Sequence, residues 1–144
     1  MILVSACLVG LNCKYNGENN FNQEIFDMVK SGEAIFVCPE QLGGLSTPRI
    51  PAEIKYIDGK KCVITKDGRD VTKEYEKGAK ETLKLMKELG INKAILKANS
   101  PSCGCGSIYD GAFSGTKIDG NGITTQFLLD NGIEVITEEE LKKM

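Results

Sequence analysis

The sequence predicts an α/β fold in which helices cover both faces of a parallel sheet. Four short apolar segments, each complete at strand length, alternate along the chain with segments of helical periodicity. Strands that alternate with helices are joined by right-handed crossovers, which make the strands parallel. A chain of 144 residues is long enough for one domain whose core needs no disulfides. We therefore expect residues 1–144 to form a single-domain, Rossmann-like, three-layer sandwich.

The apolar segments predict four strands, over residues 2–6, 34–37, 93–97 and 133–136. At four or five residues each, they are complete as strands and too short to be helices. The first segment stops at Cys7, and the second stops at Cys38, which Pro39 follows at once. Asn and Gly are frequent from residue 8 to residue 20, which predicts a loop after the first strand.

Capping signals place the first helix over residues 23–31. Asn22 is a residue type that accepts a hydrogen bond from the first helical turn, and Gly32 is placed to end the helix. Phe21 precedes the cap and is placed to pack on Phe26 as a hydrophobic staple. Local sequence alone therefore fixes both ends of this helix.

The strongest helical periodicity begins at Asp70 and stops at Gly90. One stripe of this helix carries Val71, Tyr75, Ala79, Thr82, Met86 and Leu89. We expect the stripe to face the core, because its members recur at the spacing of one helical face. Shorter helices are predicted over residues 124–129 and 138–143.

Pro and Gly predict irregular structure in the remaining segments. Residues 39–51 form a rigid loop with Pro at both ends, and an ordered loop of that length is usually functional. Asp58-Gly59 separates the strand-like segments 54–57 and 62–65, which predicts a small β-hairpin insertion. Residues 98–122 are rich in small residues and predict a second long loop.

The composition excludes several kinds of site. The chain has six Cys but no His and no Trp. Without imidazole there is no Ser-His-Asp triad, no Cys-His pair and no His-ligated metal site. The 18 Lys and Arg are interspersed with 20 Asp and Glu, for a net charge of -2. This balance makes nucleic acid and anionic lipid unexpected partners, so the expected partner is a small molecule.

The cysteines are best interpreted together with the expected compartment. The N-terminal segment lacks the basic residues of a secretion signal, and no apolar run reaches membrane-spanning length, so we expect a cytoplasmic protein. In a reducing compartment, six Cys indicate metal binding, catalysis or burial more than a disulfide framework.

Three of the six Cys follow predicted core strands. Cys7 comes directly after the first strand, Cys38 directly after the second, and Cys103 in the loop after the third. The carboxyl ends of parallel strands share one edge of the sheet, so we expect these thiols to converge. Three thiolates without imidazole favour a soft metal centre, either an iron-sulfur cluster with one open iron or a zinc ion. The alternative for each Cys is a small buried hydrophobic side chain.

The other three Cys have separate assignments. Cys13 lies on the loop after Cys7 and is a candidate additional ligand, a resolving thiol or a residue without a role. Cys105 follows Cys103 by two residues, and that spacing is strained for two ligands of one metal, so an exposed position is preferred over an additional ligand. Cys62 lies in the predicted hairpin and is expected in the core.

Polar residues near the same sheet edge supply candidate chemistry. Glu40 is the candidate general acid or base, since a partly desolvated carboxyl has a raised pKa; the alternative is a solvated loop carboxylate. Asn99, Ser100 and Ser102 can hydrogen-bond a heterocycle or carbonyl of a substrate, or instead form the turn around the neighbouring Pro. Arg49 either clamps an anionic substrate group or pairs with Glu40.

Several motifs together resemble a bacterial family that includes thiouracil desulfidases. They are VSACLVG at 4–10, CKYNG at 13–17, VCPEQLGGL at 37–45, TPR at 47–49, DVT at 70–72 and KANSPSCG at 97–104. The resemblance runs in order from residue 4 to about residue 132, which is nearly the whole chain. It implies that residues 1–144 are one desulfidase-like domain that acts on a small thiolated pyrimidine.

The resemblance also implies a cofactor and a reaction. Family membership implies a 4Fe-4S cluster held by Cys7, Cys38 and Cys103, whose fourth iron is free to bind the sulfur of a thiocarbonyl. Glu40 and Ser100 take the catalytic positions. On this hypothesis Glu40 protonates the ring or activates water, water adds at the carbon, and sulfur leaves as hydrosulfide without net electron transfer. The expected substrate is 2-thiouracil or a similar heterocycle.

Two other functions stay open at this stage. A structural or regulatory protein would use the same thiols to bind zinc and would have no desulfidase activity. A thiol redox protein would exchange Cys13 with Cys7, or Cys103 with Cys105, as a disulfide pair. Metal analysis distinguishes the zinc protein from the desulfidase, and thiol counting after mild oxidation distinguishes the thiol redox protein from it.

Overall fold

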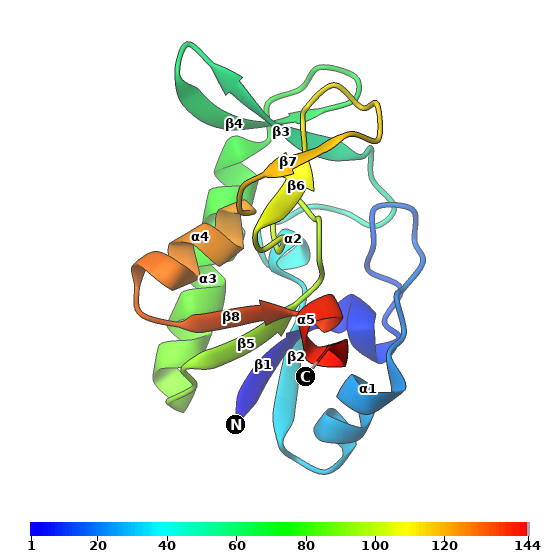
Figure 1. Ribbon diagram of the computed structural model, residues 1–144, viewed down its shortest axis with the longest axis vertical. Coiled ribbons are helices and arrows are strands. Elements are labelled where there is room, and N and C mark those ends of the chain that lie inside the picture. The colour runs from blue at the N-terminus through cyan, green and yellow to red at the C-terminus, as the bar shows by residue number, and fades with distance from the viewer. Residues whose placement is uncertain (144) are drawn as a thin grey trace.

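A four-stranded parallel sheet forms the centre of the molecule (Figure 1). The computed structural model describes residues 1–143. The strands are β1 (Ile2–Ser5), β2 (Ala34–Val37), β5 (Lys93–Leu96) and β8 (Glu134–Thr137), in the order β2-β1-β5-β8. In the centre, Val4 of β1 pairs with Phe36 on one side and Ile95 on the other. The predicted α/β class and the four predicted core strands are confirmed.

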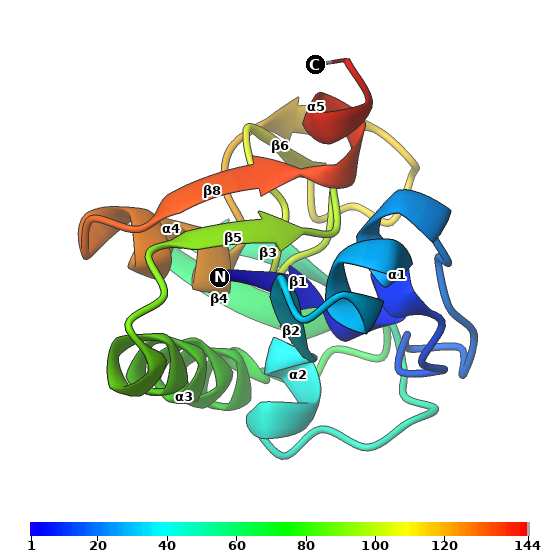
Figure 2. The same cartoon turned by 90° about the horizontal axis from the view of Figure 1, so that it is seen from below.

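Helices cover both faces of this sheet (Figure 2). Side chains alternate along each strand, so Leu3 packs with α3 (Thr72–Leu89) and α4 (Ile123–Asp130) on one face. Its neighbour Val4 packs on the opposite face with α1 (Gln23–Lys30) and the short 3-10 helix η1 (Ala6–Val9). The terminal helix α5 (Glu138–Lys142) adds Leu141 to that second face. The predicted three-layer sandwich is therefore confirmed.

The ends of α1 follow the predicted capping signals. The Asn22 side chain accepts a hydrogen bond from the Ile25 amide at 3.1 Å. The rings of Phe21 and Phe26 lie 5.4 Å apart between centroids, which is the expected staple. Gly32 follows the helix with a φ of +85°, a conformation that glycine adopts without strain.

The long helix α3 packs mainly through the predicted stripe. Tyr75, Ala79, Thr82 and Met86 are buried, but Leu89 is 52% exposed because the last turn extends past the sheet. The expectation that Leu89 packs in the core was wrong. No helix within residues 1–143 is both long and apolar enough to cross a membrane.

The segment after β2 contains a helix where the sequence predicted an irregular loop. Pro39 begins a short helix, α2 (Pro39–Leu42), because its missing N–H and fixed φ suit the first helical position. This helix lies against α3 with almost no space between backbones. A Cβ on Gly43 would lie 2.0 Å from the Glu74 carbonyl oxygen, and one on Gly78 would lie 2.0 Å from the Pro39 carbonyl oxygen. Glycine at both positions permits the contact.

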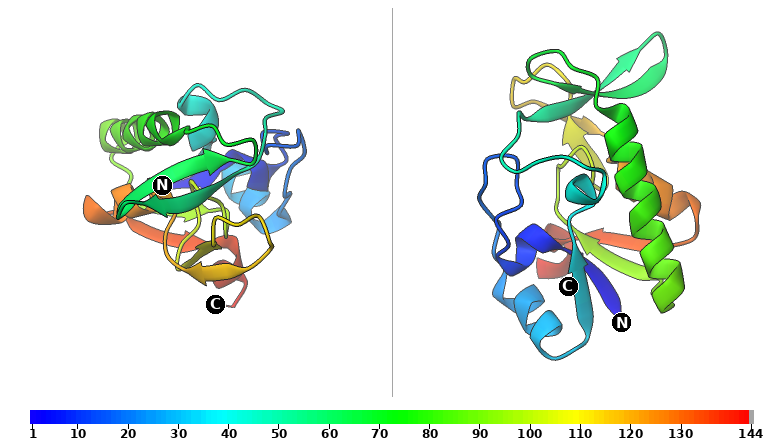
Figure 3. Two further views of the ribbon diagram at one scale, coloured as in Figure 1. Left: turned by 90° about the horizontal axis from the view of Figure 1, so that it is seen from above. Right: turned by 180° about the vertical axis from the view of Figure 1, so that it is seen from behind.

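Two antiparallel hairpins lie together at one end of the molecule (Figure 3). The first joins β3 (Ala52–Ile57) to β4 (Lys60–Thr65) through Asp58-Gly59, as predicted. The second joins β6 (Ser107–Tyr109) to β7 (Lys117–Asp119), within a segment predicted to be a loop. Strands of three residues are too short to show the period of two by which strands are recognised, so this hairpin leaves little signal in the sequence.

Candidate active site

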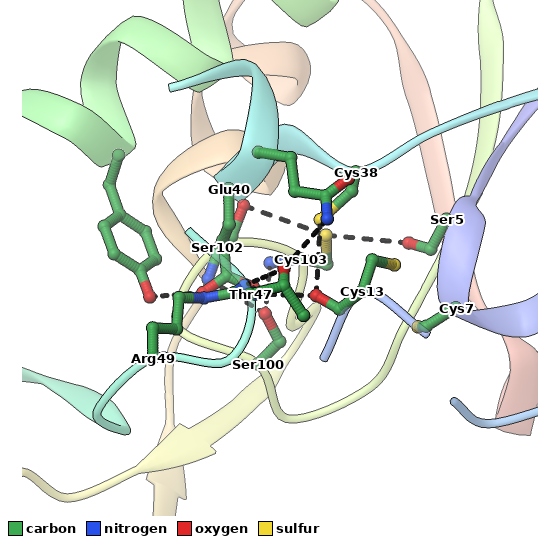
Figure 4. Close-up of polar contacts among 12 residues, drawn as sticks. Ser5, Cys7, Cys13, Cys38, Glu40, Thr47, Arg49, Ser100, Ser102 and Cys103 are labelled. Atoms are coloured by element: carbon green, nitrogen blue, oxygen red, sulfur yellow. Dashed lines mark hydrogen bonds and ion pairs between the residues drawn. The ribbon is translucent and has the colours of Figure 1, made fainter. Parts of the chain in front are cut away.

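A cavity of about 540 Å³ lies at the carboxyl ends of β1, β2 and β5. Cys7 enters it from the segment after β1, Cys38 from the segment after β2, and Cys103 from the loop after β5. The structure thus brings together the three thiols that the sequence predicted to converge (Figure 4). The topology explains this, because loops that follow parallel strands gather at one edge of the sheet.

Cys13 adds a fourth thiol to the same cavity. Its thiol lies beside those of Cys38 and Cys7, and its interaction with them and its burial hold the pKa of Cys13 far above the usual thiol range. The same contacts lower the pKa of Cys7, and they lower that of Cys38 to about 7. Cys13 is therefore a proton donor among thiols that favour the ionised form.

Two of the strand-end thiols accept hydrogen bonds from fixed side chains. Ser5 Oγ donates to Cys103 Sγ at 3.6 Å, and Asn20 Nδ2 donates to Cys7 Sγ at 3.7 Å. Ser5 is itself oriented, because its Oγ accepts the Lys97 amide hydrogen at 3.0 Å. Burial still raises the pKa of Cys103 to about 12, against the opposing effect of Ser5. These donors fix the direction of both sulfur atoms.

Glu40 lines the cavity beside the thiols and is held through both carboxylate oxygens. The Tyr75 hydroxyl donates to Oε1. Arg49 Nη2 lies 3.2 Å from Oε2 and also donates to the Cys13 carbonyl oxygen at 2.9 Å. Burial and the Glu40 charge raise the pKa of Tyr75, so the phenol stays a donor. Glu40 is therefore an oriented acceptor at the wall of the cavity.

Arg49 pairs with Glu40, which is the second of the two roles that the sequence predicted for it. Its side chain is 8% exposed and is absent from the cavity wall within the described residues, so it pairs with Glu40 and leaves no free guanidinium toward the cavity. Its Nη1 donates to the Ser46 carbonyl and to Thr47 Oγ1, both at 3.0 Å. Arg49 therefore ties the 46–49 segment to Glu40 and Cys13.

The loop after β5 divides its polar residues between the cavity and the interior. Ser100 and Asn99 line the cavity. Ser100 Oγ accepts the amide hydrogens of Ser102 and Cys103, at 3.0 and 2.9 Å, which leaves its own hydroxyl hydrogen for another acceptor. Ser102 is 1% exposed and its hydroxyl bonds Thr124 Oγ1 at 2.8 Å. Ser102 thus lies behind the loop and outside the described cavity wall.

The two remaining Cys lie away from the four cavity thiols. Cys105 is half-buried with its Sγ 3.8 Å from the Val135 carbonyl, and burial raises its pKa. It is not among the described residues that line the cavity. Cys62 is buried in β4, as predicted, where it borders a separate hollow of about 700 Å³ between β4, α3 and α4. Charged side chains dominate that hollow.

The terminal helix α5 supports the edge of the cavity through its first residue. Glu138 Oε1 accepts the Ala98 amide hydrogen at 2.7 Å, and its Oε2 pairs with Lys97 Nζ at 2.9 Å. Lys97 lines the cavity, and its charge helps to lower the pKa of Cys7. Glu138 therefore fixes the backbone that leads from β5 toward Cys103.

Sequence analysis missed four residues that shape this site: Ser5, Asn20, Tyr75 and Lys97. Tyr75 carried the clearest signal, because a buried Tyr on an apolar stripe needs a hydrogen-bond partner for its hydroxyl. Ser5 lies at the end of an apolar strand, two residues before Cys7, and its buried hydroxyl likewise requires a hydrogen-bond partner. Asn20 and Lys97 gave no signal, because only the fold brings them to the thiols.

The donor set suits a soft metal centre. Four thiols share the cavity with the carboxylates of Glu40 and Glu53, and thiolates are the ligands that iron-sulfur clusters use. Three of these thiols follow three different strands, so they reach the cavity from separate segments of the chain.

Three findings relate the chain to known proteins. Residues 2–140 match the model of the 2-thiouracil desulfurase family. Uncharacterized protein YbbK of Bacillus subtilis (strain 168) is 48% identical over an alignment of 147 positions, which covers 98% of this chain and 97% of that protein. A solved structure, the 4Fe-4S-dependent thiouracil desulfidase TudS (DUF523Vcz), has a TM-score of 0.89 and 42% identity, covering 99% of this chain and 93% of that one.

The matched family is the one that the motifs resembled, so that prediction is confirmed together with the predicted enzyme class, a thiouracil desulfidase. The match extends over both the strand-end thiols and the loops that carry Glu40 and Ser100. The chain therefore belongs to the 2-thiouracil desulfurase family.

Proposed function

We propose that the chain converts a thiocarbonyl heterocycle such as 2-thiouracil into the oxo compound and hydrosulfide. The proposal includes a 4Fe-4S cluster held by Cys7, Cys38 and Cys103. One observation carries it: the three strand-end thiols line a single cavity together with the oriented carboxylate of Glu40. The family match and the similarity to a 4Fe-4S-dependent desulfidase support the same reaction.

The hydrogen bonds support this choice of three ligands out of four thiols. Ser5 and Asn20 donate to Cys103 and Cys7, as outer partners do when they orient ligating sulfurs. Within the described residues, the Cys13 sulfur has no such outer donor and interacts with the other thiols. We therefore assign Cys13 outside the ligand set. When bound, the cluster supplies a Lewis-acidic iron that has no protein ligand.

Glu40 acts as the general base in this proposal. Tyr75 and Arg49 both donate to its carboxylate and so fix its orientation at the cavity wall, and a general base must be held within hydrogen-bond reach of the water that it deprotonates. The water oxygen bonds to the thiocarbonyl carbon, the proton of the added hydroxyl passes to sulfur, the C–S bond breaks, and sulfur leaves as hydrosulfide while Glu40 holds the first proton. Carbon and sulfur keep their oxidation states, so the reaction needs no external reductant or oxidant. The chain has no His, so acid-base work falls to this carboxylate.

Ser100 and Asn99 hold the substrate in this proposal. The Ser100 hydroxyl hydrogen is free of the two amides that its oxygen accepts, so it can donate to a ring nitrogen or to the developing oxygen. Asn99 lines the cavity from the same loop and offers an amide to the heterocycle. Arg49 orients Glu40 instead of contacting substrate.

A second candidate function rests on the position of Cys13. Its free thiol lies beside those of both Cys7 and Cys38, which is the arrangement that a thiol-exchange protein would need. This alternative predicts loss of two thiols on mild oxidation of iron-free protein and no desulfuration. The 4Fe-4S proposal predicts that iron binding protects the same thiols from oxidation.

The test is reconstitution with iron and sulfide without air, followed by assay with 2-thiouracil. We expect about four irons per chain, the broad visible absorption of a 4Fe-4S cluster, and formation of uracil and hydrosulfide. Cys38→Ser should bind less iron and lose activity, whereas Cys105→Ser, which alters a thiol outside the cavity, should retain both. Turnover by zinc-loaded, iron-free protein would overturn the proposal.

A further inference from the structure

The cavity has a second wall that the proposed chemistry does not use. The thiols and Glu40 lie at the sheet edge, while the two hairpins contribute Glu53 from β3, Tyr109 from β6, and Phe113 from the turn between β6 and β7. This wall carries no thiol. It places aromatic rings at a cavity whose opposite side holds the reactive groups.

The turn that carries Phe113 is anchored to the first hairpin. Glu53 Oε1 accepts the amide hydrogens of Gly111 at 3.0 Å and of Phe113 at 3.1 Å. Gly111 lies so close to β3 that a Cβ there would be 2.7 Å from the Ile54 carbonyl oxygen. The Asp110 amide also bonds the Thr116 carbonyl at 3.0 Å. The position of the turn is therefore determined by the neighbouring hairpin.

The backbone at Phe113 is in an unfavourable conformation for its residue type. Its φ is +55°, in the left-handed region that Gly, Asn and Asp adopt most readily. The Glu53 bonds, together with the Asp110–Thr116 backbone bond, hold a phenylalanine in this conformation. Glycine would adopt this φ without strain if the turn had only a structural role. The half-buried Phe113 side chain lines the cavity, so an aromatic ring at this position indicates a role in the cavity.

We propose that Phe113 is a specificity-determining residue whose ring stacks on the flat heterocycle of the substrate, and that Glu53 is the positioning residue for it. Stacking favours a planar conjugated thiocarbonyl over a small aliphatic one, because only the former offers a π-face. Of the other rings on this wall, Tyr109 already has the Lys117 ammonium 5.9 Å from its centroid. This inference rests on the proposed desulfuration, and it explains how the enzyme would select planar heterocyclic substrates.

The test compares three variants of the anaerobically reconstituted enzyme. Phe113→Leu should raise KM for 2-thiouracil about two- to tenfold, the range that an aromatic pair provides, with little change in kcat. Phe113→Tyr, which keeps the ring, should restore KM. Tyr56→Leu removes an exposed ring from the same hairpin pair outside the cavity and should leave KM unchanged. KM for thioacetamide, which has no ring, should be equal in all three.

A second readout does not depend on the cluster. Binding of uracil to the protein, measured by saturation-transfer NMR with and without iron, should weaken in Phe113→Leu and in Glu53→Ala but not in Tyr56→Leu. Hydrogen exchange should show the turn at residues 110–116 loosened only in Glu53→Ala. Equal KM and equal uracil binding in Phe113→Leu and Tyr56→Leu would overturn the inference. Absence of wild-type turnover alongside Phe113-dependent uracil binding would instead overturn the proposed reaction.

Discussion

Tyr75 of helix α3 donates its hydroxyl hydrogen to Glu40 Oε1, linking the longest helix of the molecule to the carboxylate at the cavity wall. The phenol is buried, and its raised pKa keeps it protonated as a donor. The contact explains why a Tyr occurs in an otherwise apolar helix face. It also makes the geometry of Glu40 dependent on a residue 35 positions away.

Tyr75→Phe should lower kcat about tenfold, as expected when a bond worth about 1.4 kcal/mol no longer orients the base. Stability should also fall by about 1 kcal/mol, because Glu40 loses one partner while the ring packing is kept. Steady-state kinetics with 2-thiouracil and thermal unfolding check both effects. Tyr56→Phe removes a hydroxyl from an exposed ring and should change neither. Unchanged kcat in Tyr75→Phe would exclude the orienting role.

Ser5→Ala should weaken retention of the cluster and reduce stability by about 1 to 3 kcal/mol, because it removes the donor to Cys103 and leaves the partly buried Lys97 amide without its acceptor. Chelator-induced loss of visible absorption and urea unfolding measure the two effects. Ser31→Ala removes an exposed hydroxyl that bonds the Met28 carbonyl and serves as the control. Equal rates of iron loss in the two variants would contradict the prediction.

Cys38 should be the most readily alkylated cavity thiol in iron-free protein. Folding lowers the pKa of this half-buried thiol to about 7, chiefly through its hydrogen bond with Cys13, so its alkylation rate should rise with a midpoint near pH 7. Cys103, buried and with a pKa of about 12, should stay unmodified. Mass spectrometry after a brief exposure to iodoacetamide gives both rates. A midpoint near pH 9 for Cys38 would contradict the assignment.

The same shift predicts the direction of a pH effect on stability. A thiol whose pKa is lowered on folding stabilises the folded state fully above its ordinary value of 9.0, and that contribution is lost as the pH falls through about 7. The contribution of Cys38 to the stability of iron-free protein should therefore be lost between pH 9 and pH 7, and the difference between wild type and Cys38→Ser isolates it from the thiols whose pKa is raised. Cys38→Ser should flatten this part of the curve, as followed by thermal unfolding across that range. An equal slope of stability against pH in wild type and Cys38→Ser would contradict the prediction.

Gly78→Ala should destabilise the protein by about 1 to 3 kcal/mol, because its Cβ would overlap the Pro39 carbonyl of α2. Alanine in place of glycine inside a helix ordinarily stabilises by about 0.5 to 1 kcal/mol, so the sign of the change is decisive. Denaturant unfolding measures it. Activity should fall as well, since α2 carries Glu40 and follows Cys38. A more stable Gly78→Ala protein would show that the helices can separate freely.

The sequence predicted the sheet, the main helices and the first hairpin because each leaves a local pattern. Asn22 caps α1, and Asp58-Gly59 turns the first hairpin, through interactions within a few residues. Helix α2 and the second hairpin are short, and their stability comes from packing against α3 and β3 that no local pattern records. Elements with a pattern in their own or adjacent residues were therefore predicted, and elements held by distant segments were missed.

The candidate site divides in a similar way. Cys7, Cys38 and Cys103 could be brought together from sequence because parallel strands fix where their ends meet. The arrangement around Glu40 could not, because it depends on which face of α3 turns toward α2 and on how the 46–49 segment folds back. Cys13 likewise reaches the cavity through the conformation of its loop, which its spacing from Cys7 does not determine.

The contacts of Glu138 bear on how complete the fold must be before the site can accept a metal centre. All four cavity thiols precede this residue in the chain, yet the segment that leads to Cys103 is held by the Glu138 carboxylate. A chain in which α5 has not docked beside β5 carries every cavity thiol but lacks this support. Metal loading is therefore best matched to the folded chain, in which Glu138 already holds the backbone at Ala98.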